Sequence, residues 1–158
     1  DYYASRGLGD VYKRQVEGKM DNIGYLLMQF SKQLRYQLNQ RLIANGLTIQ
    51  QWAVMQQISL WVERTAQQPT ANQLCHVLDM DRPTMSGILR RLAAKQLVEQ
   101  EVNPADQRAK LLRLTQVGIQ ELQAGQHISD QVVATGLQKL TAAEKQSLRQ
   151  LLKKLGSD

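Results

Sequence analysis

The segment from Thr70 to Thr115 most constrains how this chain folds, because two helix-forming patterns joined by a short turn run straight into two strand-forming ones. Thr70 is suited to cap the first helix, and residues 79–82 form the turn. Asp81 is suited to cap the second helix, whose first turn contains Pro83, where a missing amide hydrogen costs little. Two helices joined in this way indicate a helix-turn-helix.

The strands after the second helix complete the pattern. Residues 98–102 and 110–114 are predicted strands, and Asn103–Pro104 is a typical turn initiator between them. Two helices followed by a hairpin predict a winged helix-turn-helix, a module that places its second helix in the major groove of DNA. A surface hairpin without such a role is the alternative interpretation.

The predicted second helix, residues 83–95, has two different faces. Its apolar positions are expected to face the core: Met85, Ile88, Leu89 and Leu92. Its other face carries hydroxyls, a glycine and arginines: Thr84, Ser86, Gly87, Arg90 and Arg91. Such a helix is held by one face and offers donors to bases and phosphates with the other. An ordinary amphipathic surface helix has the same pattern, and the following wing favours the groove-reading interpretation.

The expected wing adds basic residues near its tip or return strand. Arg108 and Lys110 are placed where they can meet backbone phosphates or the minor groove. Asp106 lies two residues before Arg108, where its carboxylate can hold the guanidinium in a fixed orientation. The segment 81–114 has seven basic and four acidic residues, so its charge of +3 is half of the formal net charge of +6. This balance suits a polyanionic partner but does not prove one.

Helical patterns precede this module. Apolar residues recur every three or four positions from Ile23 to Leu42, and Gly46 is expected to end that helix in a left-handed conformation. Thr48 is expected to cap the next helix. The inward positions of that helix are predicted to be Trp52, Met55, Ile58 and Val62.

Two more helices are predicted after Thr115 and Thr141. The apolar faces of the first and the two late helices exceed what one small module can cover, so a helical dimer interface is expected, with packing inside one chain as the alternative. The chain is thus divided into a dimerisation helix at 20–46, a DNA-binding lobe at 47–115 and dimerisation helices at 116–158. The predicted fold class is mostly α with a small β-wing.

The residue inventory argues against an enzyme, a membrane protein and a metal protein. Cys75 is the only cysteine, so no intrachain disulfide can form, and we expect it to be a small core residue. Cys75 and His76 diverge by about 100° on a helix, and His76 with Asp79 supplies only two metal ligands. No apolar run approaches the roughly 20 residues that span a bilayer. We therefore expect a cytoplasmic protein without catalytic residues, metal or cofactor.

The first residues form a separate case. Asp10 to Gln15 read DVYKRQ, the translation of GATGTGTATAAGAGACAG, which resembles a transposon end used in sequencing-library preparation. Residues 1–15 are therefore expected to be a non-native leader, with the native start near Met20. A natural polar tail is the alternative.

Residues 24–155 resemble the MarR family of bacterial transcriptional regulators. The most specific part is the wing string DQRAK at 106–110, followed by Leu114, Thr115 and Gly118, which is similar to the family pattern D-x-R-A-K, then L-T-x-x-G. Residues 91–98 are similar to the end of the family's recognition helix, and residues 47–51 to the opening of its second helix.

The resemblance implies a homodimer in which both chain ends build the base and two winged modules bind a pseudo-palindrome in double-stranded DNA. It implies that the helix at 83–95 enters the major groove and that Arg108, oriented by Asp106, reaches the minor groove. The candidate DNA contacts are Arg82, Thr84, Ser86, Arg90, Arg91, Asp106, Arg108 and Lys110. Many members release DNA when a small, often aromatic, ligand binds, so a ligand-responsive repressor is expected. Candidates to line the ligand site, with a core role as the alternative, are Tyr25, Tyr36 and Trp52.

Three positions depart from the family pattern. Gly87 stands where a basic residue is frequent, and Gln96 replaces a common glycine, so that a left-handed cap there costs more. Residues 99–101 begin the wing with acidic charge where an arginine is usual, which puts wing placement or affinity in doubt. The alternative function is a winged-helix protein-interaction module without specific DNA binding, since a fold does not fix function.

Overall fold

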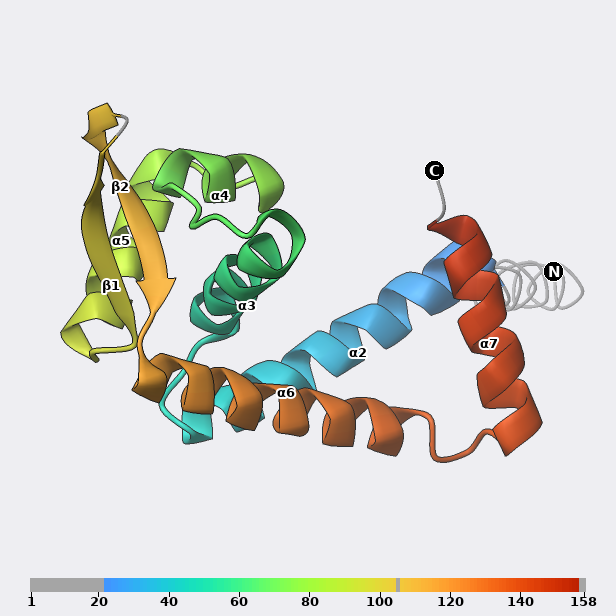
Figure 1. The fold of residues 1–158 in the computed structure, drawn as a ribbon. Helices are drawn as coiled ribbons and strands as arrows, with labels where there is room; N and C mark the ends of the chain where they lie inside the picture. Colours follow the sequence, from blue (N-terminus) through green and yellow to red (C-terminus); the bar gives the residue numbers. More distant parts are fainter. Residues whose placement is uncertain (1–21, 105, 157–158) are drawn as a thin grey trace, which may run out of the picture. The chain divides into compact units, whose positions relative to one another are not determined.

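A computed structural model of the chain describes residues 22–104 and 106–156. The predicted leader at 1–15 and the predicted start at Met20 lie outside the described residues. Of the described residues, those up to Gln37 belong to one unit and those from Leu38 belong to a second. In chain order the elements are α2 (Ile23–Ala44), α3 (Ile49–Thr65), α4 (Ala71–Val77), α5 (Arg82–Ala94), β1 (Val98–Asn103), β2 (Asp106–Leu114), α6 (Gln116–Gly136) and α7 (Ala142–Leu155) (Figure 1).

Within the second unit, α3, α4 and α5 gather beside the β1–β2 hairpin (Figure 1). The two strands are antiparallel, with Val98 opposite Leu114. An isolated bridge joins Thr70 to Leu111, and the Leu112 amide donates to the Pro69 carbonyl at 2.8 Å. This short third edge ties the hairpin to the start of α4. The structure thus confirms the predicted fold class, mostly helical with a small two-stranded wing.

The helices begin where local capping chemistry dictates. Thr48, Thr70, Asp81, Thr115 and Thr141 each have extended backbone, and each side chain accepts a bond from the amide three residues on. These bonds satisfy amides that have no partner inside a helix. All five caps are as predicted, because the signal lies within four consecutive residues.

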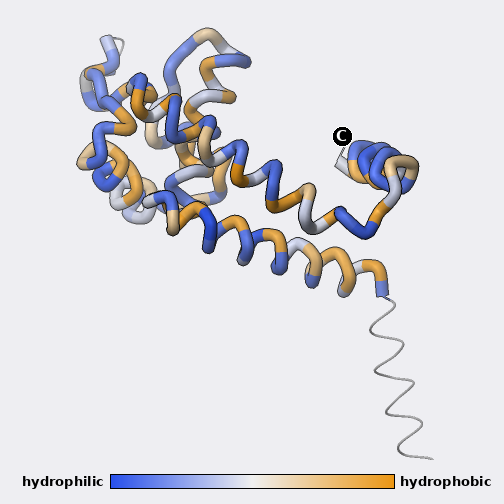
Figure 2. The backbone as a smooth tube through the Cα atoms, turned by 90° about the horizontal axis from the view of Figure 1, so that it is seen from below, coloured by the Kyte–Doolittle hydropathy of each residue, from blue (hydrophilic) through white to orange (hydrophobic). Residues whose placement is uncertain are grey.

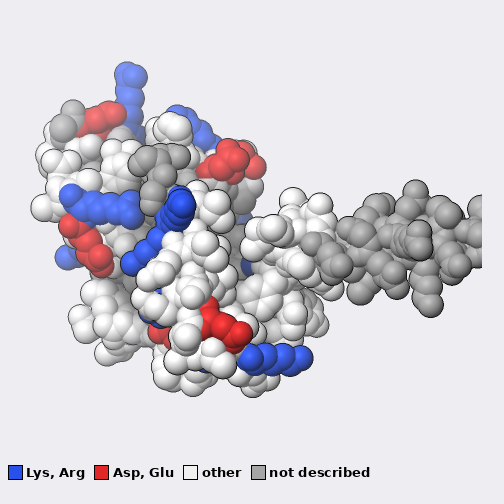
Figure 3. Space-filling model, turned by 90° about the vertical axis from the view of Figure 1, so that its right-hand side faces the viewer, with Lys and Arg blue, Asp and Glu red and all other residues white. Residues whose placement is uncertain are grey.

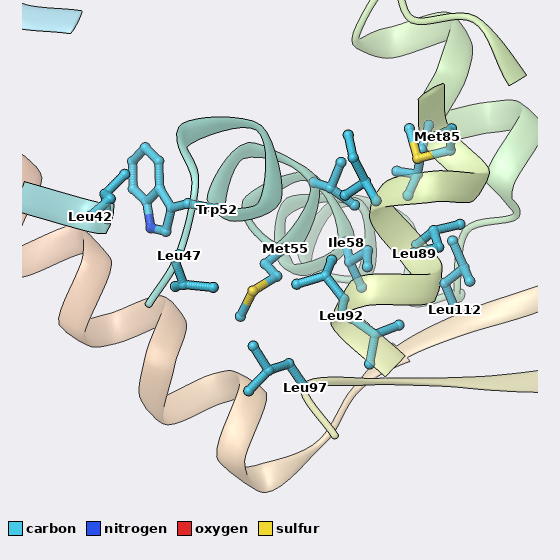
Figure 4. Close-up of a cluster of buried hydrophobic side chains, with 14 residues drawn as sticks. Leu42, Leu47, Trp52, Met55, Ile58, Met85, Leu89, Leu92, Leu97 and Leu112 are labelled. Atoms are coloured by element: carbon cyan, nitrogen blue, oxygen red, sulfur yellow. The ribbon is translucent and has the colours of Figure 1, made fainter. Parts of the chain in front are cut away.

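The core of the second unit is aliphatic and lies where α3, α4, α5 and the strands meet (Figure 4). Met55 and Ile58 of α3 lie against the apolar face of α5, and every predicted inward position of α5 is buried: Met85, Ile88, Leu89 and Leu92. Val62 is 41% exposed, so its prediction was wrong. The last turn of α3 extends beyond the core cluster, and helical period alone does not show where a core ends. Cys75 is only partly buried and packs against this cluster.

The wing is longer and tighter than the sequence suggested. The second strand begins at Asp106 and not at Lys110, so the strands extend to within a short turn at Pro104. The prediction failed because Asp106, Arg108 and Lys110 are polar and exposed, so no buried face imposes the alternation that identifies a strand. The extension includes Arg108 in β2, within an irregularity of the ladder between the pairs Val102–Lys110 and Asn103–Asp106.

Helix α6 approaches the lobe closely at a glycine. The Thr115 hydroxyl donates to the Gln96 carbonyl at 2.6 Å, and the Thr115 amide donates to the Leu97 carbonyl at 3.1 Å. A Cβ at Gly118 would lie 2.0 Å from the Leu97 carbonyl oxygen. The Leu-Thr-x-x-Gly string therefore encodes a backbone-to-backbone junction between the wing and α6. Gln96 itself has a left-handed φ of 57° without being glycine.

Apolar residues also recur along the helices outside the lobe, as the orange bands of α2 and α6 show in Figure 2. In the first unit Ile23 and Met28 are each 76% exposed. In the second unit Leu155 of α7 is 77% exposed, and Leu151 is also exposed. Among the described helices, none has the length and hydropathy that a bilayer crossing requires.

Candidate nucleic-acid interface

Helix α5 presents a polar surface because its four buried residues, which are all large and apolar, face the core. Asp81 caps it, and the Thr84 amide and hydroxyl donate to the Asp81 carboxylate at 2.7 and 2.9 Å. These two bonds hold the pKa of Asp81 below its ordinary value of 3.8. A negative charge at this end also suits the helix dipole. The start of α5 is therefore well fixed, which is what a helix that must fit a groove requires.

An open groove of about 650 Å³ lies between α5 and the wing. Its α5 wall contributes Arg82, Ser86 and Arg90, which follow one another at four-residue steps and so lie on one stripe. Its wing wall contributes Arg108 and Lys110 from β2. The rest of the lining comes from the start of α4, from β1 and from apolar positions beneath: Thr70, Ala71, Asn72, Leu89, Ala93, Gln100, Ala109 and Leu112.

Five of the predicted DNA contacts therefore share one groove, although the two groups are about 20 residues apart in sequence. Their four cations are exposed. Within residues 22–104 and 106–156, both ion pairs in the structure belong to Arg113, and neither involves a groove cation. Cations without carboxylate partners are free to meet phosphates or base edges.

The acidic start of the wing lies on the other face of the hairpin. Neighbouring residues of a strand point to opposite faces, so Glu99 and Glu101 point away from the groove that Gln100 lines. Both carboxylates bind the Arg113 guanidinium, with Nη2–Oε distances of 2.6 and 3.1 Å. The charge of these two acids is therefore directed at Arg113 and not into the groove.

Asp106 differs from its predicted geometry. Its Oδ1 accepts the backbone amide of Arg108 at 3.0 Å, and the structure shows no ion pair between the Asp106 carboxylate and the Arg108 guanidinium. The predicted clamp on the guanidinium was therefore wrong. A carboxylate two residues before an amide readily forms an Asx turn, so Asp106 shapes the backbone of the wing tip and leaves the guanidinium free.

Thr84 and Arg91 lie outside the groove between α5 and the wing. The Thr84 hydroxyl hydrogen is engaged with Asp81. Arg91 lines a separate depression of about 380 Å³ with Gly46 and Lys95, whose Nζ donates to the Gly46 carbonyl. The predicted contacts on α5 thus separate into a stripe that faces the wing and a second stripe on the other side of the helix.

The three candidate ligand-site aromatics have different environments. Trp52 is 7% exposed, and its Nε1 donates to the Leu122 carbonyl at 3.4 Å. A Cβ at Gly125 would lie 2.4 Å from the indole, so Trp52 joins α3 closely to α6. Tyr25 and Tyr36 are exposed and belong to the first unit. The core alternative fits Trp52, while the ligand role of all three stays a prediction.

Asn72 and Gln100 are groove residues that the sequence analysis missed. Asn72 lies two residues after Thr70, the N-cap of α4. Its polar side chain in the first turn of that helix could have indicated a groove residue. Gln100 gave no signal, because its side of the hairpin depends on strand register. Among the described residues, no three His, Cys, Asp or Glu side chains gather as metal ligands.

The face of the molecule drawn in Figure 3 carries charges of both signs. On the face drawn in Figure 3, Lys and Arg side chains alternate with Asp and Glu among neutral residues. No uniformly basic field covers this face, so the groove cations without carboxylate partners, and not the net charge, favour a polyanionic partner.

A helix-turn-helix, a hairpin and a cationic groove between them define a winged helix-turn-helix protein. The MarR family profile matches residues 45–109, the centre of this lobe. The chain is 25% identical over 135 residues to the HTH-type transcriptional repressor NicR of Pseudomonas putida, covering 85% of this chain and 82% of NicR.

Solved structures agree with this match. A cysteine-to-serine mutant of MarR from E. coli is 30% identical, with a TM-score of 0.75 over 85% of this chain and 96% of that one. The same mutant complexed with operator DNA is 28% identical, with a TM-score of 0.68 over 87% and 96%. The chain belongs to the MarR family of transcriptional regulators.

Proposed function

We propose that this regulator is a homodimeric repressor that binds a pseudo-palindromic operator in double-stranded DNA and releases it when a small aromatic effector binds. The observation that carries the proposal is the groove in which cations of α5 and β2 converge without carboxylate partners. The repressor NicR and the operator complex of MarR support it as relatives.

The groove residues are proposed to contact different parts of the DNA according to their position. The buried face of α5 fixes the helix, while Ser86 and Arg90 on its exposed side are proposed to meet base edges or phosphates in the major groove. Arg108 at the wing is proposed to enter the minor groove, where a narrow groove attracts guanidinium groups. Arg82 and Lys110, which also line the groove between α5 and the wing, are proposed to meet backbone phosphates. Asp106 contributes through the shape of the wing tip.

The homodimer is proposed from unpaired apolar surface. Large apolar side chains are exposed on α7 and at the start of α2, among them Leu155, Ile23 and Met28. Several such side chains on one helix are typical of a protein–protein interface. A two-fold dimer would cover such surface and would present two α5 helices to half-sites on the order of 10 base pairs apart. We expect the protein with residues 20–158 to sediment as a dimer at micromolar concentration.

The effector proposal follows from the same architecture. A ligand changes DNA affinity only if it binds the two conformations of the protein unequally. Helix α6 joins the lobe through Gly118 and through the contact between Trp52 and Gly125, so a shift of α6 would move the lobe. Titrating aromatic acids and phenols into the DNA complex should identify a compound that releases it.

The test begins with selection of bound sequences from random duplex DNA, which should enrich an inverted repeat. On that operator, Arg90→Ala and Arg108→Ala should each weaken binding by at least tenfold. Lys139→Ala, which removes the same charge in the α6–α7 connection, should bind like wild type. Each lost phosphate contact should lower the salt slope by about one unit.

Two outcomes would contradict the proposal. If both arginine variants bind like wild type, the assignment of the interface is wrong. If a folded dimer enriches no sequence and binds DNA with no dependence on salt, the protein-interaction module becomes the better interpretation.

A further inference from the structure

The second polar stripe of α5 contains an unexplained glycine. Gly87 lies in the interior of the helix, where glycine costs about 1 kcal/mol relative to alanine. Among the described glycines, positive φ is found at Gly46, so the backbone at Gly87 does not require glycine. Packing does not require it either, because the only atom within 4 Å of a Cβ built there is Nη2 of Arg91, at 3.6 Å.

Arg91 occupies the space that Gly87 leaves open. The two residues are four apart, and helical side chains lean toward the N-terminus, so the guanidinium of Arg91 lies over the preceding turn. No ion pair holds it among the residues that the structure describes. Lys95, one turn further on, is engaged with the Gly46 carbonyl and does not share this position.

This geometry places the positive charge of Arg91 about one turn nearer the start of α5 than its own backbone. The first half of a recognition helix lies deepest in the major groove, and Arg91 belongs by sequence to the second half of α5. Its guanidinium nevertheless lies beside Gly87, at the middle of the exposed stripe that begins at Thr84. A planar guanidinium with free donors can bind the O6 and N7 atoms of guanine in a bidentate manner.

We propose that Gly87 and Arg91 act together as a specificity determinant: the absence of a side chain at Gly87 lets the Arg91 guanidinium reach a guanine in each half-site. This inference rests on the proposed DNA-binding function. It differs from that proposal by assigning base recognition to a stripe of α5 that does not line the groove facing the wing.

The experiment uses the full chain, the operator enriched by wild type, and a double-mutant cycle. Arg91→Ala should lose at least tenfold in affinity, and selection with this variant should lose a guanine preference at one position of each half-site. Gly87→Leu should lose as much, because its side chain fills the space over residue 87 and displaces the guanidinium. Gly87→Ala is the matched control, since its Cβ makes only an ordinary contact at 3.6 Å, and it should bind like wild type.

The double variant Gly87→Leu/Arg91→Ala decides the mechanism. If the two residues act together, it binds no worse than either single variant. If the leucine obstructs DNA directly, the two losses multiply and the proposal is overturned. An unchanged sequence preference in Arg91→Ala overturns it as well, while the losses of Arg90→Ala and Arg108→Ala would leave the proposed function standing. Failure of wild type itself to enrich any sequence would overturn both.

Discussion

Replacing Gly118 by alanine should destabilise the protein, although alanine is the better helix former. In the structure, the added Cβ would lie 2.0 Å from the Leu97 carbonyl oxygen, 3.0 Å from its carbon and 3.3 Å from its Cα. An ordinary C···O contact is about 3.3 Å or longer, so α6 must retreat by about 1.3 Å. The neighbour is backbone and cannot rotate away as a side chain would.

The magnitude follows from what the retreat breaks. Thr115 makes two hydrogen bonds to the Gln96 and Leu97 carbonyls at this junction, each worth about 1 kcal/mol. Overpacking adds about 1–3 kcal/mol, and the gain in helix propensity returns about 1 kcal/mol. The expected net loss is about 2–4 kcal/mol. With a urea m-value of about 2 kcal/mol per molar, the midpoint should fall by about 1–2 M.

Urea unfolding followed by circular dichroism, at one fixed protein concentration, measures this shift. Gly87→Ala is the matched control, because its Cβ meets nothing closer than 3.6 Å. That control should gain up to about 1 kcal/mol from helix propensity. If Gly118→Ala is as stable as wild type, the close approach of α6 to the Leu97 carbonyl is wrong, and with it the explanation of the Leu-Thr-x-x-Gly string.

Two further predictions concern charge. The double variant Glu99→Gln/Glu101→Gln should free Arg113 and raise DNA affinity several-fold at low salt. The gain should fade above 0.15 M salt, where the screening length falls below about 8 Å. An affinity equal to that of wild type at low salt would contradict this prediction. Because its bonds with Thr84 lower the pKa of Asp81 in the folded state, this carboxylate contributes stability at neutral pH that is lost as pH falls through the folded pKa. Asp81→Asn retains a cap but cannot titrate, so its stability should fall less than that of wild type between pH 7 and pH 3 in thermal unfolding; equal losses would show that the shift has no effect on folding.

The sequence predicted the helices well because their signals are local. A cap such as Asp81 is defined by a bond to a residue three positions on, and the inward face of α5 follows from helical period. The same logic failed at Val62 and at the start of β2. At both places the outcome depended on where the surrounding core ends, and the spacing of apolar residues in the sequence does not give that boundary.

The candidate site shows most clearly which features the sequence predicted and which features the fold decided. Residue type and spacing were enough to predict a winged helix-turn-helix and to nominate Arg90 and Arg108. Only the fold brought these two residues to one groove, because the hairpin must pack beside α5 before its cations and those of the helix can meet.

Strand register and side-chain direction decided the rest. Alternation along β1 turned the acids at 99 and 101 away from the groove and toward Arg113. Asp106 bonded to an amide instead of a guanidinium, and the Arg91 guanidinium lay near Gly87. A shift of one residue in register reverses every facing on a strand, so the composition of the wing could be judged from the sequence, while the direction of its charges was determined only by tertiary packing.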